Sequence, residues 1–294
     1  MGAKKLEDLF KKFYLNLKAL KYLLTIEINN KVKISFWNRI KALRHGFASC
    51  RYELYNFDQH NIRDFVSDFA DWKTSAINDP YIIVTKDKFL FEHLLKTYEI
   101  TPKNYGFIKN KEIIFQNKVI TSETLIKIIE DKQSLIFKSN QGSGGAGVFR
   151  IDFINNLYFV NKKLITKEAL LKLIMTFNDH IISESLVPIQ FAKEIFPDTI
   201  NTIRIITMRD PITSAVFIPF AIHKFGSVSS IPVDNFAKGG IVVKIDVETG
   251  TLSKVAQKGT PSQVIWYDHH PETKVLIKGK IIPEWAKIKK QLQL

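Results

Sequence analysis

Apolar side chains near the N-terminus recur at the spacing of an α-helix. Lysines fill many of the intervening positions of this stretch, which runs from Lys4 to Ile28. The apolar positions are Leu6, Leu9, Phe10, Phe13, Leu17, Leu20 and Leu24. The pattern predicts an amphipathic helix. Its apolar face either docks onto the protein's own core or a partner subunit, or makes a peripheral membrane contact through a basic amphipathic surface.

Short apolar segments after residue 80 predict strands, and capping residues between them predict helices. Asp87 is expected to begin a helix that runs to about Tyr98. Turns at Asn155-Asn156 and Asp210-Pro211 predict two β-hairpins. The expected strands cover residues 82–84, 134–139, 148–154, 157–160, 180–187, 201–208, 214–224, 241–247 and 251–257, and FIKNKEIIF (107–115) suggests an irregular strand pair. The pattern predicts an α+β fold whose second half is dominated by antiparallel hairpins.

Composition narrows the class of protein. The 294 residues are 45% hydrophobic and 24% charged, which is typical of a soluble globular protein of about two domains. Cys50 is the single cysteine, so no internal disulfide can form, which fits a reducing, cytoplasmic compartment. The sequence contains no run of 18 apolar residues, so no membrane-spanning helix is predicted. It also lacks the uninterrupted apolar segment that a signal peptide requires.

The net charge of +14 favours a polyanionic partner, which could be nucleic acid, an anionic membrane face or an acidic polymer. No nucleic-acid-binding module is recognisable, so a nucleic-acid partner is not expected. A basic composition also arises without any such partner. Charge therefore leaves the partner open, with a membrane-associated position on the cytoplasmic face as one interpretation.

Residues 137–151, FKSNQGSGGAGVFRI, contain a formal G-x-G-x-x-G at Gly142, Gly144 and Gly147. A dinucleotide site requires a helix directly after the last glycine, but the strand-like VFRIDFI follows here. A P-loop would end in Gly-Lys-Ser/Thr, and a protein kinase would place its lysine on a later strand. Lys138 instead precedes the glycines. The remaining interpretation is a strand–lysine–glycine loop–strand unit that covers a triphosphate, with backbone N–H groups as donors.

In this order of elements the chain resembles the ATP-grasp superfamily: Asp87-Lys88 opens a helix, Lys138 precedes QGSGGAG, and Glu184 lies in IISESLV. It is more closely similar to the sugar-transfer-associated ATP-grasp family. The residues that carry this resemblance are NTIRIITMRD (201–210), VDNFAKGGIVVKIDVETG (233–250) and HPETKVLIKGKIIPEW (270–285).

The resemblance implies an ATP-grasp fold, in which two α+β subdomains grip ATP, with an N-terminal helical extension. The ranges expected are 1–75 for the helical and mixed region, 76–133 for the N-terminal or linker part, 134–187 for the glycine-loop subdomain and 188–294 for an incomplete C-terminal subdomain. It also implies residues that bind ATP: Lys88, Lys138, Gly142, Ser143, Gly144, Gly145, Gly147, Glu184, Ser185 and Leu186. Lys88 would lie near adenine and the α-phosphate, Lys138 at the phosphates, and Glu184 at adenine.

Members of this family resemble carboxylate–amine ligases, which form an acylphosphate with ATP and then an amide. The resemblance thus implies a carboxylated sugar or an amino acid as substrate, in surface-polysaccharide assembly. Arg204 stands among apolar residues of an expected strand, so we expect it to be buried and to stabilise the transferred phosphoryl group, alongside Lys138, or to form a structural ion pair. Lys224, with His223 beside it, and Asp234-Asn235 are candidates for binding substrate, although the Asp-Asn pair equally fits a turn.

Magnesium is the point where the resemblance fails. ATP-grasp enzymes bind Mg²⁺ through a late acidic residue and a Glu-x-Asn. We find no Glu-x-Asn among the nine residues that follow Trp285 or elsewhere in the second half of the chain. Asp246 is a weak candidate ligand, and the pair His269-His270 is not expected to hold a metal. A truncated enzyme, a catalytically inactive nucleotide-binding or scaffold subunit, and a site completed by a partner all remain open. A kinase on the same fold is a weaker alternative.

Overall fold

The structure is a computed structural model that describes residues 2–30, 32–74, 81–95, 101–258 and 264–292. The chain forms two compact units. The first comprises Met1–Ile82 with Gly259–Val264, and the second comprises Ile83–Lys258 with Ile265–Leu294. No helix of the described residues has the length and apolar character needed to cross a membrane. The four subdomain ranges expected from the sequence stay predictions.

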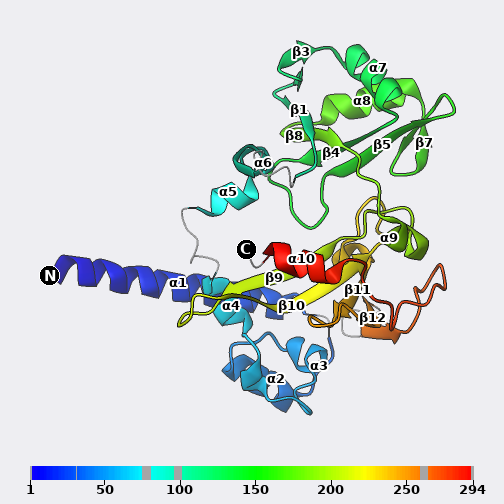
Figure 1. The fold of residues 1–294 in the computed structure, drawn as a ribbon. Helices are drawn as coiled ribbons and strands as arrows, with labels where there is room; N and C mark the ends of the chain where they lie inside the picture. Colours follow the sequence, from blue (N-terminus) through cyan, green and yellow to red (C-terminus); the bar gives the residue numbers. More distant parts are fainter. Residues whose placement is uncertain (1, 31, 75–80, 96–100, 259–263, 293–294) are drawn as a thin grey trace. The chain divides into compact units, whose positions relative to one another are not determined.

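The part of the first unit that the structure describes is helical (Figure 1). Its elements are α1 (Gly2–Ile28), α2 (Phe36–Arg44), α3 (Arg51–Leu54), the 3-10 helix η1 (Ile62–Asp64) and α4 (Asp68–Thr74). The predicted N-terminal helix is therefore confirmed. Buried Phe47, Tyr52 and Phe57 form most of a small aromatic core. The Asp68 carboxylate stabilises the loop before α3 and the start of that helix. It accepts a hydrogen bond from Ala48 N at 2.9 Å and forms an ion pair with the guanidinium of Arg51 at 2.8 Å.

The apolar stripe predicted on α1 does not pack against the core of its own unit. Its seven side chains are between 45% and 66% exposed. Other positions of the helix make the internal contacts: Ala19 and Leu23 are buried, and α1 packs against α4. The Glu27 carboxylate accepts hydrogen bonds from the backbone N–H and the hydroxyl of Ser49, at 2.7 and 2.8 Å.

The second unit contains an eight-stranded antiparallel sheet with the order β3-β2-β1-β8-β4-β5-β6-β7. Its strands are β1 (Asn104–Lys109), β2 (Glu112–Phe115), β3 (Lys118–Ile120), β4 (Ser134–Ser139), β5 (Val148–Ile154), β6 (Leu157–Val160), β7 (Lys163–Ile165) and β8 (His180–Glu184). Helices α7 (Ser122–Lys132) and α8 (Lys167–Thr176) lie side by side against this sheet (Figure 1). The hairpin predicted at Asn155-Asn156 is confirmed as β5–β6.

Local sequence explains why α7 and α8 form where they do. The hydroxyl of Thr121 accepts a hydrogen bond from Thr124 N, and that of Thr166 accepts one from Ala169 N, each at 3.2 Å. These contacts cap the two helices. Buried Leu125 and Ile129 of α7, together with apolar side chains of α8, then cover the sheet and close its core.

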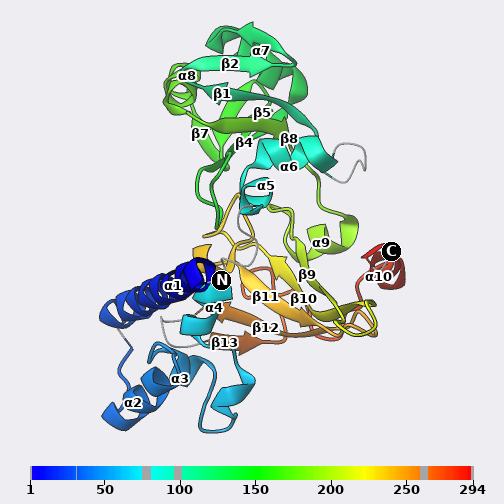
Figure 2. The ribbon, with the colours of Figure 1, turned by 90° about the vertical axis from the view of Figure 1, so that its left-hand side faces the viewer.

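A five-stranded sheet with the order β13-β12-β11-β10-β9, whose pairs from β9 to β12 are antiparallel, completes the second unit (Figure 2). Its strands are β9 (Ile203–Arg209), β10 (Val216–Phe225), β11 (Ile241–Ile245), β12 (Leu252–Lys258) and β13 (Val264–Tyr267). Ala221 and Ile245 are register partners on the buried face, where side chains of α9 (Gln190–Ile195) and α10 (Trp285–Leu292) pack against them. The hairpin predicted across Asp210-Pro211 is confirmed as β9–β10.

One predicted strand is wrong. Residues 82–84 belong to a short helix, α5 (Ile82–Lys86), because a short apolar run is compatible with either state and periodicity cannot distinguish them. The helix predicted after Asp87 is confirmed as α6 (Lys88–Leu95), but its predicted end at Tyr98 lies outside the described residues. The strand pair predicted near residues 107–115 is present as β1 and β2.

Candidate functional site

A cavity of about 200 Å³ in the second unit brings several of the predicted residues together. Lys138, Glu184, Leu186 and Asp234 all line it. They come from β4, from β8 and the segment after it, and from the loop before β11. A larger cavity of about 520 Å³, between α6 and strands β1 and β2, is lined by none of the predicted residues. The smaller cavity is therefore the candidate site.

The lining residues that were not predicted include Ile136, Val148 and Thr202. Ile136 could have been found, because it precedes Lys138 by two residues on one strand and so shares its face of the sheet. Val148 pairs with Lys138 across β4 and β5. Thr202 comes from a distant segment, so only the tertiary structure places it here.

Lys138 supplies a positive charge to the wall of this cavity. It is partly buried in β4 and has no hydrogen bond or ion pair with any described residue. Burial lowers the pKa of its ammonium below the usual value, and the positive charge of Lys88 lowers it further, whereas Glu92 raises it. An unpaired, partly desolvated cation attracts an anionic ligand more strongly than one in water does.

Lys88 is bonded to the start of the glycine loop. Its Nζ donates to the carbonyl oxygens of Ser139, Asn140 and Gly142 at 3.0, 2.9 and 2.6 Å. An ammonium group has three N–H donors, so these contacts engage all of them. Burial lowers the pKa of Lys88, partly offset by the charge of Asp87. In this conformation Lys88 has no donor left for a phosphate.

Asp87 and Asn140 join the N-terminus of α6 to the same loop. One Asp87 oxygen accepts from Leu90 N at 2.9 Å, which is the predicted helix cap. The other accepts from the Asn140 side chain at 2.8 Å, and Asn140 Oδ1 accepts from Phe89 N at 3.1 Å. The bond from Leu90, with help from Asn140, holds the pKa of the Asp87 carboxyl below its usual range. Asn140 was not predicted, although its place two residues before the first glycine of the loop is a usable signal.

The glycine loop has a backbone that few other residues could adopt. Gly144, Gly145 and Gly147 have φ values of +62°, +78° and +67°, in the left-handed region that favours glycine. The turn closes through Ala146 N, which donates to the carbonyl of Ser143 at 3.1 Å. At its base, Ser139 N donates to the carbonyl of Gly147 at 3.0 Å.

Gly145 is also needed because space is tight. A Cβ at this position would lie 2.8 Å from Val233 Cγ2, on the loop beside Asp234, whereas a Cβ on Gly144 would meet nothing within 4 Å. Gly142 has no positive φ, but its Cβ would lie 2.9 Å from that of Ser139. Steric contact therefore restricts Gly142 and Gly145, whereas backbone conformation alone restricts Gly144.

Glu184 lies in the cavity wall, but its carboxylate is already engaged. Its Oε1 accepts from Lys103 N at 2.6 Å, and its backbone N–H donates to the Lys103 carbonyl at 2.9 Å. These bonds fix the end of β8 next to β1. Leu186 is 41% exposed and presents its side chain at the cavity, and Ser185 lies between the two. Residues 184–186 therefore present backbone groups and an apolar surface to the cavity, rather than a free carboxylate.

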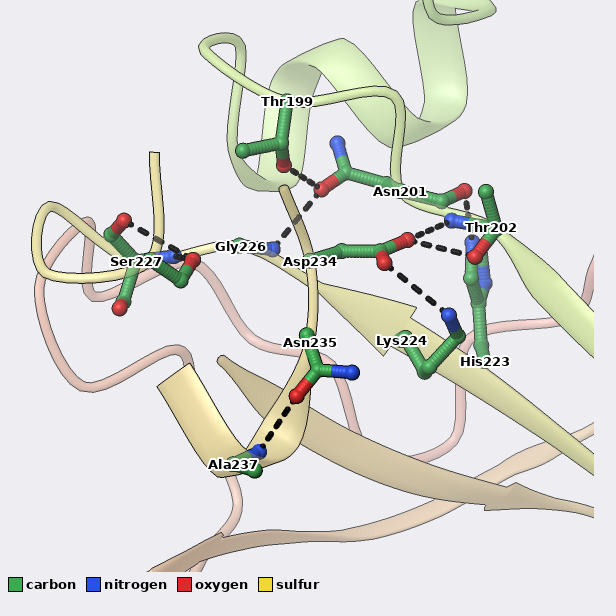
Figure 3. Close-up of polar contacts among 11 residues, drawn as sticks. Thr199, Asn201, Thr202, His223, Lys224, Gly226, Ser227, Asp234, Asn235 and Ala237 are labelled. Atoms are coloured by element: carbon green, nitrogen blue, oxygen red, sulfur yellow. Dashed lines mark hydrogen bonds and ion pairs between the residues drawn. The ribbon is translucent and has the colours of Figure 1, made fainter. Parts of the chain in front are cut away.

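Asp234 is held by an ion pair and two hydrogen bonds (Figure 3). Its Oδ1 lies 3.0 Å from Lys224 Nζ, and its Oδ2 accepts from both the N–H and the hydroxyl of Thr202 at 2.6 Å. Asn235 caps a short helical turn, since its side chain accepts from Ala237 N at 2.8 Å. The structure thus brings Lys224 and Asp234 together beside the cavity and places Asn235 in the turn that follows.

His223 packs behind this ion pair and faces the core. Its Nε2 lies 3.0 Å from the carbonyl of Asn201, and its ring lies 4.0 Å from that of Phe225. Burial lowers the pKa of His223 to about 4, so the ring is neutral at pH 7. A neutral, 2% exposed ring is part of the scaffold under the cavity.

The expectation that Arg204 is buried is wrong. Its side chain is exposed. It lies on the same face of the five-stranded sheet as Ile222, its register partner on β10, and Lys244, the partner of Ile222 on β11. Only the opposite face is covered by α9 and α10. Apolar neighbours along a strand do not reveal which face is covered. Arg204 is therefore a solvent-facing cation, and no structural ion pair with a described residue engages it.

The described acidic residues do not fit a magnesium site. No group of three or more His, Cys, Asp or Glu side chains suited to a metal lies among them. Asp246 accepts from the N–H and the hydroxyl of Thr249, each at 2.8 Å, and these bonds hold the pKa of its carboxyl below the usual range. Asp246 is thus a turn residue, while Glu184 and Asp234 are engaged as described above.

Comparison with known proteins identifies the family but no individual relative. Neither the curated proteins nor the solved structures contain a match to the chain. The family model described as sugar-transfer-associated ATP-grasp matches residues 71–292, which include the glycine loop and the whole cavity. The chain therefore belongs to the sugar-transfer-associated ATP-grasp family, which implies the ATP-grasp fold and an ATP-binding site.

Proposed function

We propose that the protein is an ATP-dependent carboxylate–amine ligase that uses the cavity at Lys138 as its nucleotide site. The observation that carries the proposal is the unpaired, partly buried ammonium of Lys138 beside the glycine loop. A cation without a carboxylate partner in a cavity of this kind suits a polyphosphate. Family membership supports ATP as the ligand.

In this proposal each part of the cavity binds one part of ATP. Lys138 contributes charge at the phosphates, and N–H groups of residues 142–147 other than that of Ala146, which donates to Ser143, contact phosphate oxygens. Ile136 and Val148 offer apolar surface to the adenine ring, and backbone groups of residues 184–186 offer hydrogen bonds to its edge. Lys88 acts through the loop that it holds, since its own donors are engaged.

The proposed reaction has two steps. A substrate carboxylate oxygen attacks the γ-phosphorus of ATP and ADP leaves, which forms an acylphosphate. An amine then attacks the acyl carbon, inorganic phosphate leaves, and the amine releases a proton to form an amide. Arg204 would stabilise the charge of the transferred group, since it lies only two residues after cavity-lining Thr202. Lys224 and Asp234 border the cavity where a substrate would enter.

The substrate that we propose is a carboxylated sugar or an amino acid joined to one, during surface-polysaccharide assembly. The family's association with sugar transfer supports this class. ATP supply and the single cysteine favour a cytoplasmic location. The peripheral membrane contact expected of the N-terminal helix stays a prediction and does not depend on this chemistry.

A second function is a nucleotide-binding scaffold without turnover. The lack of a fitting magnesium site among the described residues favours it, because phosphoryl transfer normally relies on a metal to neutralise developing charge. Such a protein would keep the affinity that Lys138 and the loop provide. A kinase on this fold would phosphorylate a hydroxyl instead and form no amide.

Two measurements on the purified full chain separate these functions. Calorimetric titration with ATP, for the wild type and Lys138→Ala, tests the nucleotide site, and unchanged affinity in the variant would refute it. Phosphate release is then measured with a panel of uronic acids and amino acids, each alone and together. Release that requires both a carboxylate and an amine supports the ligase. A phosphorylated hydroxyl product indicates the kinase, and ATP binding without any product indicates the scaffold.

A further inference from the structure

Helix α1 has two apolar faces, and only one of them is used within its own unit. The internal face is centred on buried Ala19 and Leu23. At about 100° per residue, the centre of the other face lies roughly 120° away around the helix. It is formed by Leu6, Phe10, Phe13, Leu17, Leu20 and Leu24, which we call the α1 stripe. These side chains are between 45% and 66% exposed.

The α1 stripe is wider than the contact seam of a two-stranded coiled coil. With Leu9 and Tyr14, which are 65% and 56% exposed, the apolar arc covers about 140° of the helix circumference at about 100° per residue. A coiled-coil seam is narrower, because it contains only the positions that face one partner helix. A broad apolar face that includes aromatic rings is typical of helices that lie in the plane of a lipid interface.

Charge favours a lipid surface over a second copy of the chain. Exposed Lys11, Lys12, Lys18 and Lys21 lie on α1 and have no acidic partner among the side chains that the structure describes. Of the acids on α1 whose side chains the structure describes, Glu7 is exposed and Glu27 is engaged by Ser49 and Arg39. Two copies that each carry a net charge of +14 repel one another, whereas an anionic bilayer attracts each copy.

We propose that α1 binds the surface of an anionic membrane, with the α1 stripe inserted at the level of the lipid headgroups and its lysines paired with lipid phosphates. The helix lies along the surface, since no described helix can span a bilayer. Ala19 and Leu23 keep α1 attached to its unit, so the contact needs no unfolding. Each lysine near an anionic surface raises the affinity about fivefold, and the effect falls with added salt.

The test is co-sedimentation of the full chain with vesicles, without nucleotide, so that its outcome does not depend on the proposed ligase activity. Vesicles of phosphatidylcholine alone are compared with vesicles that also contain phosphatidylglycerol. We expect binding to the anionic vesicles only, and a loss of about tenfold or more in Leu17→Glu, because a charge replaces a leucine that the proposed contact inserts into the lipid. Leu17 is half exposed in the free protein, so the variant should keep its fold, which circular dichroism checks.

A matched control is Ile212→Glu, which places the same charge on an apolar residue that is 92% exposed in the β9–β10 turn and should bind like the wild type. Replacing Lys11, Lys18 and Lys21 by Gln should weaken binding and its salt dependence. No binding of the wild type to anionic vesicles, or equal losses in Leu17→Glu and Ile212→Glu, overturns the proposal. A dimer in light scattering that Leu17→Glu dissociates, with no vesicle binding, assigns the α1 stripe to a second copy instead.

Discussion

The Nζ of Lys88 lies 2.6 Å from the carbonyl oxygen of Gly142, across 54 residues of sequence. Two more carbonyls, those of Ser139 and Asn140, complete the set of acceptors around the same ammonium. The side chain expected from the resemblance to contact a nucleotide directly is therefore bonded to the backbone at the start of the glycine loop. Lys88 and Lys138 are both cations near one cavity, but only Lys138 is free to bind an anion.

Replacing Lys88 by Met should loosen the glycine loop in the absence of nucleotide. Three carbonyls lose a charged donor, so we expect the free energy of unfolding to fall by about 1–3 kcal/mol. Hydrogen exchange of residues 139–147 should become faster, and ATP affinity should fall less than in Lys138→Met. Lys86→Met, which removes an exposed lysine two residues earlier, is the matched control. Unchanged loop exchange with a full loss of ATP affinity would instead make Lys88 a phosphate ligand.

Replacing Lys138 by Met should weaken ATP binding without destabilising the apoprotein. Because the folded state lowers the pKa of this lysine, the unfolded chain binds more protons in the pH range just below the ordinary value of 10.5. Stability of the wild type should therefore rise with pH in that range, and the variant should lack this component. Urea denaturation of the wild type and the variant across alkaline pH measures this dependence of stability on pH. A variant that is less stable at pH 7 would point to an ion pair at Lys138.

Alanine at Gly145 should be more harmful than alanine at Gly144. Both substitutions strain a left-handed backbone by about 1–2 kcal/mol. Only Gly145→Ala also brings a Cβ within 2.8 Å of Val233. We expect the larger loss of ATP affinity and of thermal stability in Gly145→Ala, and partial recovery when Val233→Ala is added. Equal effects at the two glycines would show that contact with Val233 is unimportant.

Asp234 should matter mainly for stability of the cavity wall. Asp234→Asn breaks its ion pair with Lys224 and weakens two bonds from Thr202, so we expect a loss of about 2–3 kcal/mol. In a double-mutant cycle with Lys224→Met, the second substitution should cost little once the first is made. Additive losses in denaturant titrations would mean that the two residues act independently, as separate substrate contacts would.

His223 should make the protein less stable in mild acid. Its pKa of about 4 in the folded state lies below the unfolded value of 6.5, so between these values only the unfolded chain takes up the proton. Stability is lost as pH falls through this window, by up to about 3 kcal/mol. His223→Gln should lack this component, whereas His93→Gln, at an exposed site, should retain it. The free energy of unfolding of the wild type and the two variants, measured from pH 7 to pH 4, tests this expectation.

Local signals were sufficient for most elements of the second unit. Thr121, Thr166 and Asp87 cap helices through contacts within three residues, so their roles could be predicted from the sequence. Turn residues likewise predicted the β5–β6 and β9–β10 hairpins. Residues 82–84 were assigned wrongly, because three apolar residues carry no periodicity.

Burial was harder to predict than secondary structure. An apolar stripe indicates which side of a helix avoids water, but not what covers it, and the stripe of α1 is exposed while Ala19 and Leu23 are buried. Arg204 shows the same limit on a strand. Its apolar neighbours face both ways, and only the packing of α9 and α10 on the opposite face leaves its side chain in solvent.

The sequence by itself determined the α+β class, the strand–lysine–glycine loop order and the family resemblance, since each depends on residues close together in the chain. Only the tertiary structure decided which cation is free. The contacts of Lys88 with Gly142 and of Lys224 with Asp234 join separate segments, and no local pattern specifies them. Those contacts engage one lysine at the loop and another at a carboxylate, and they leave Lys138 unpaired in the cavity.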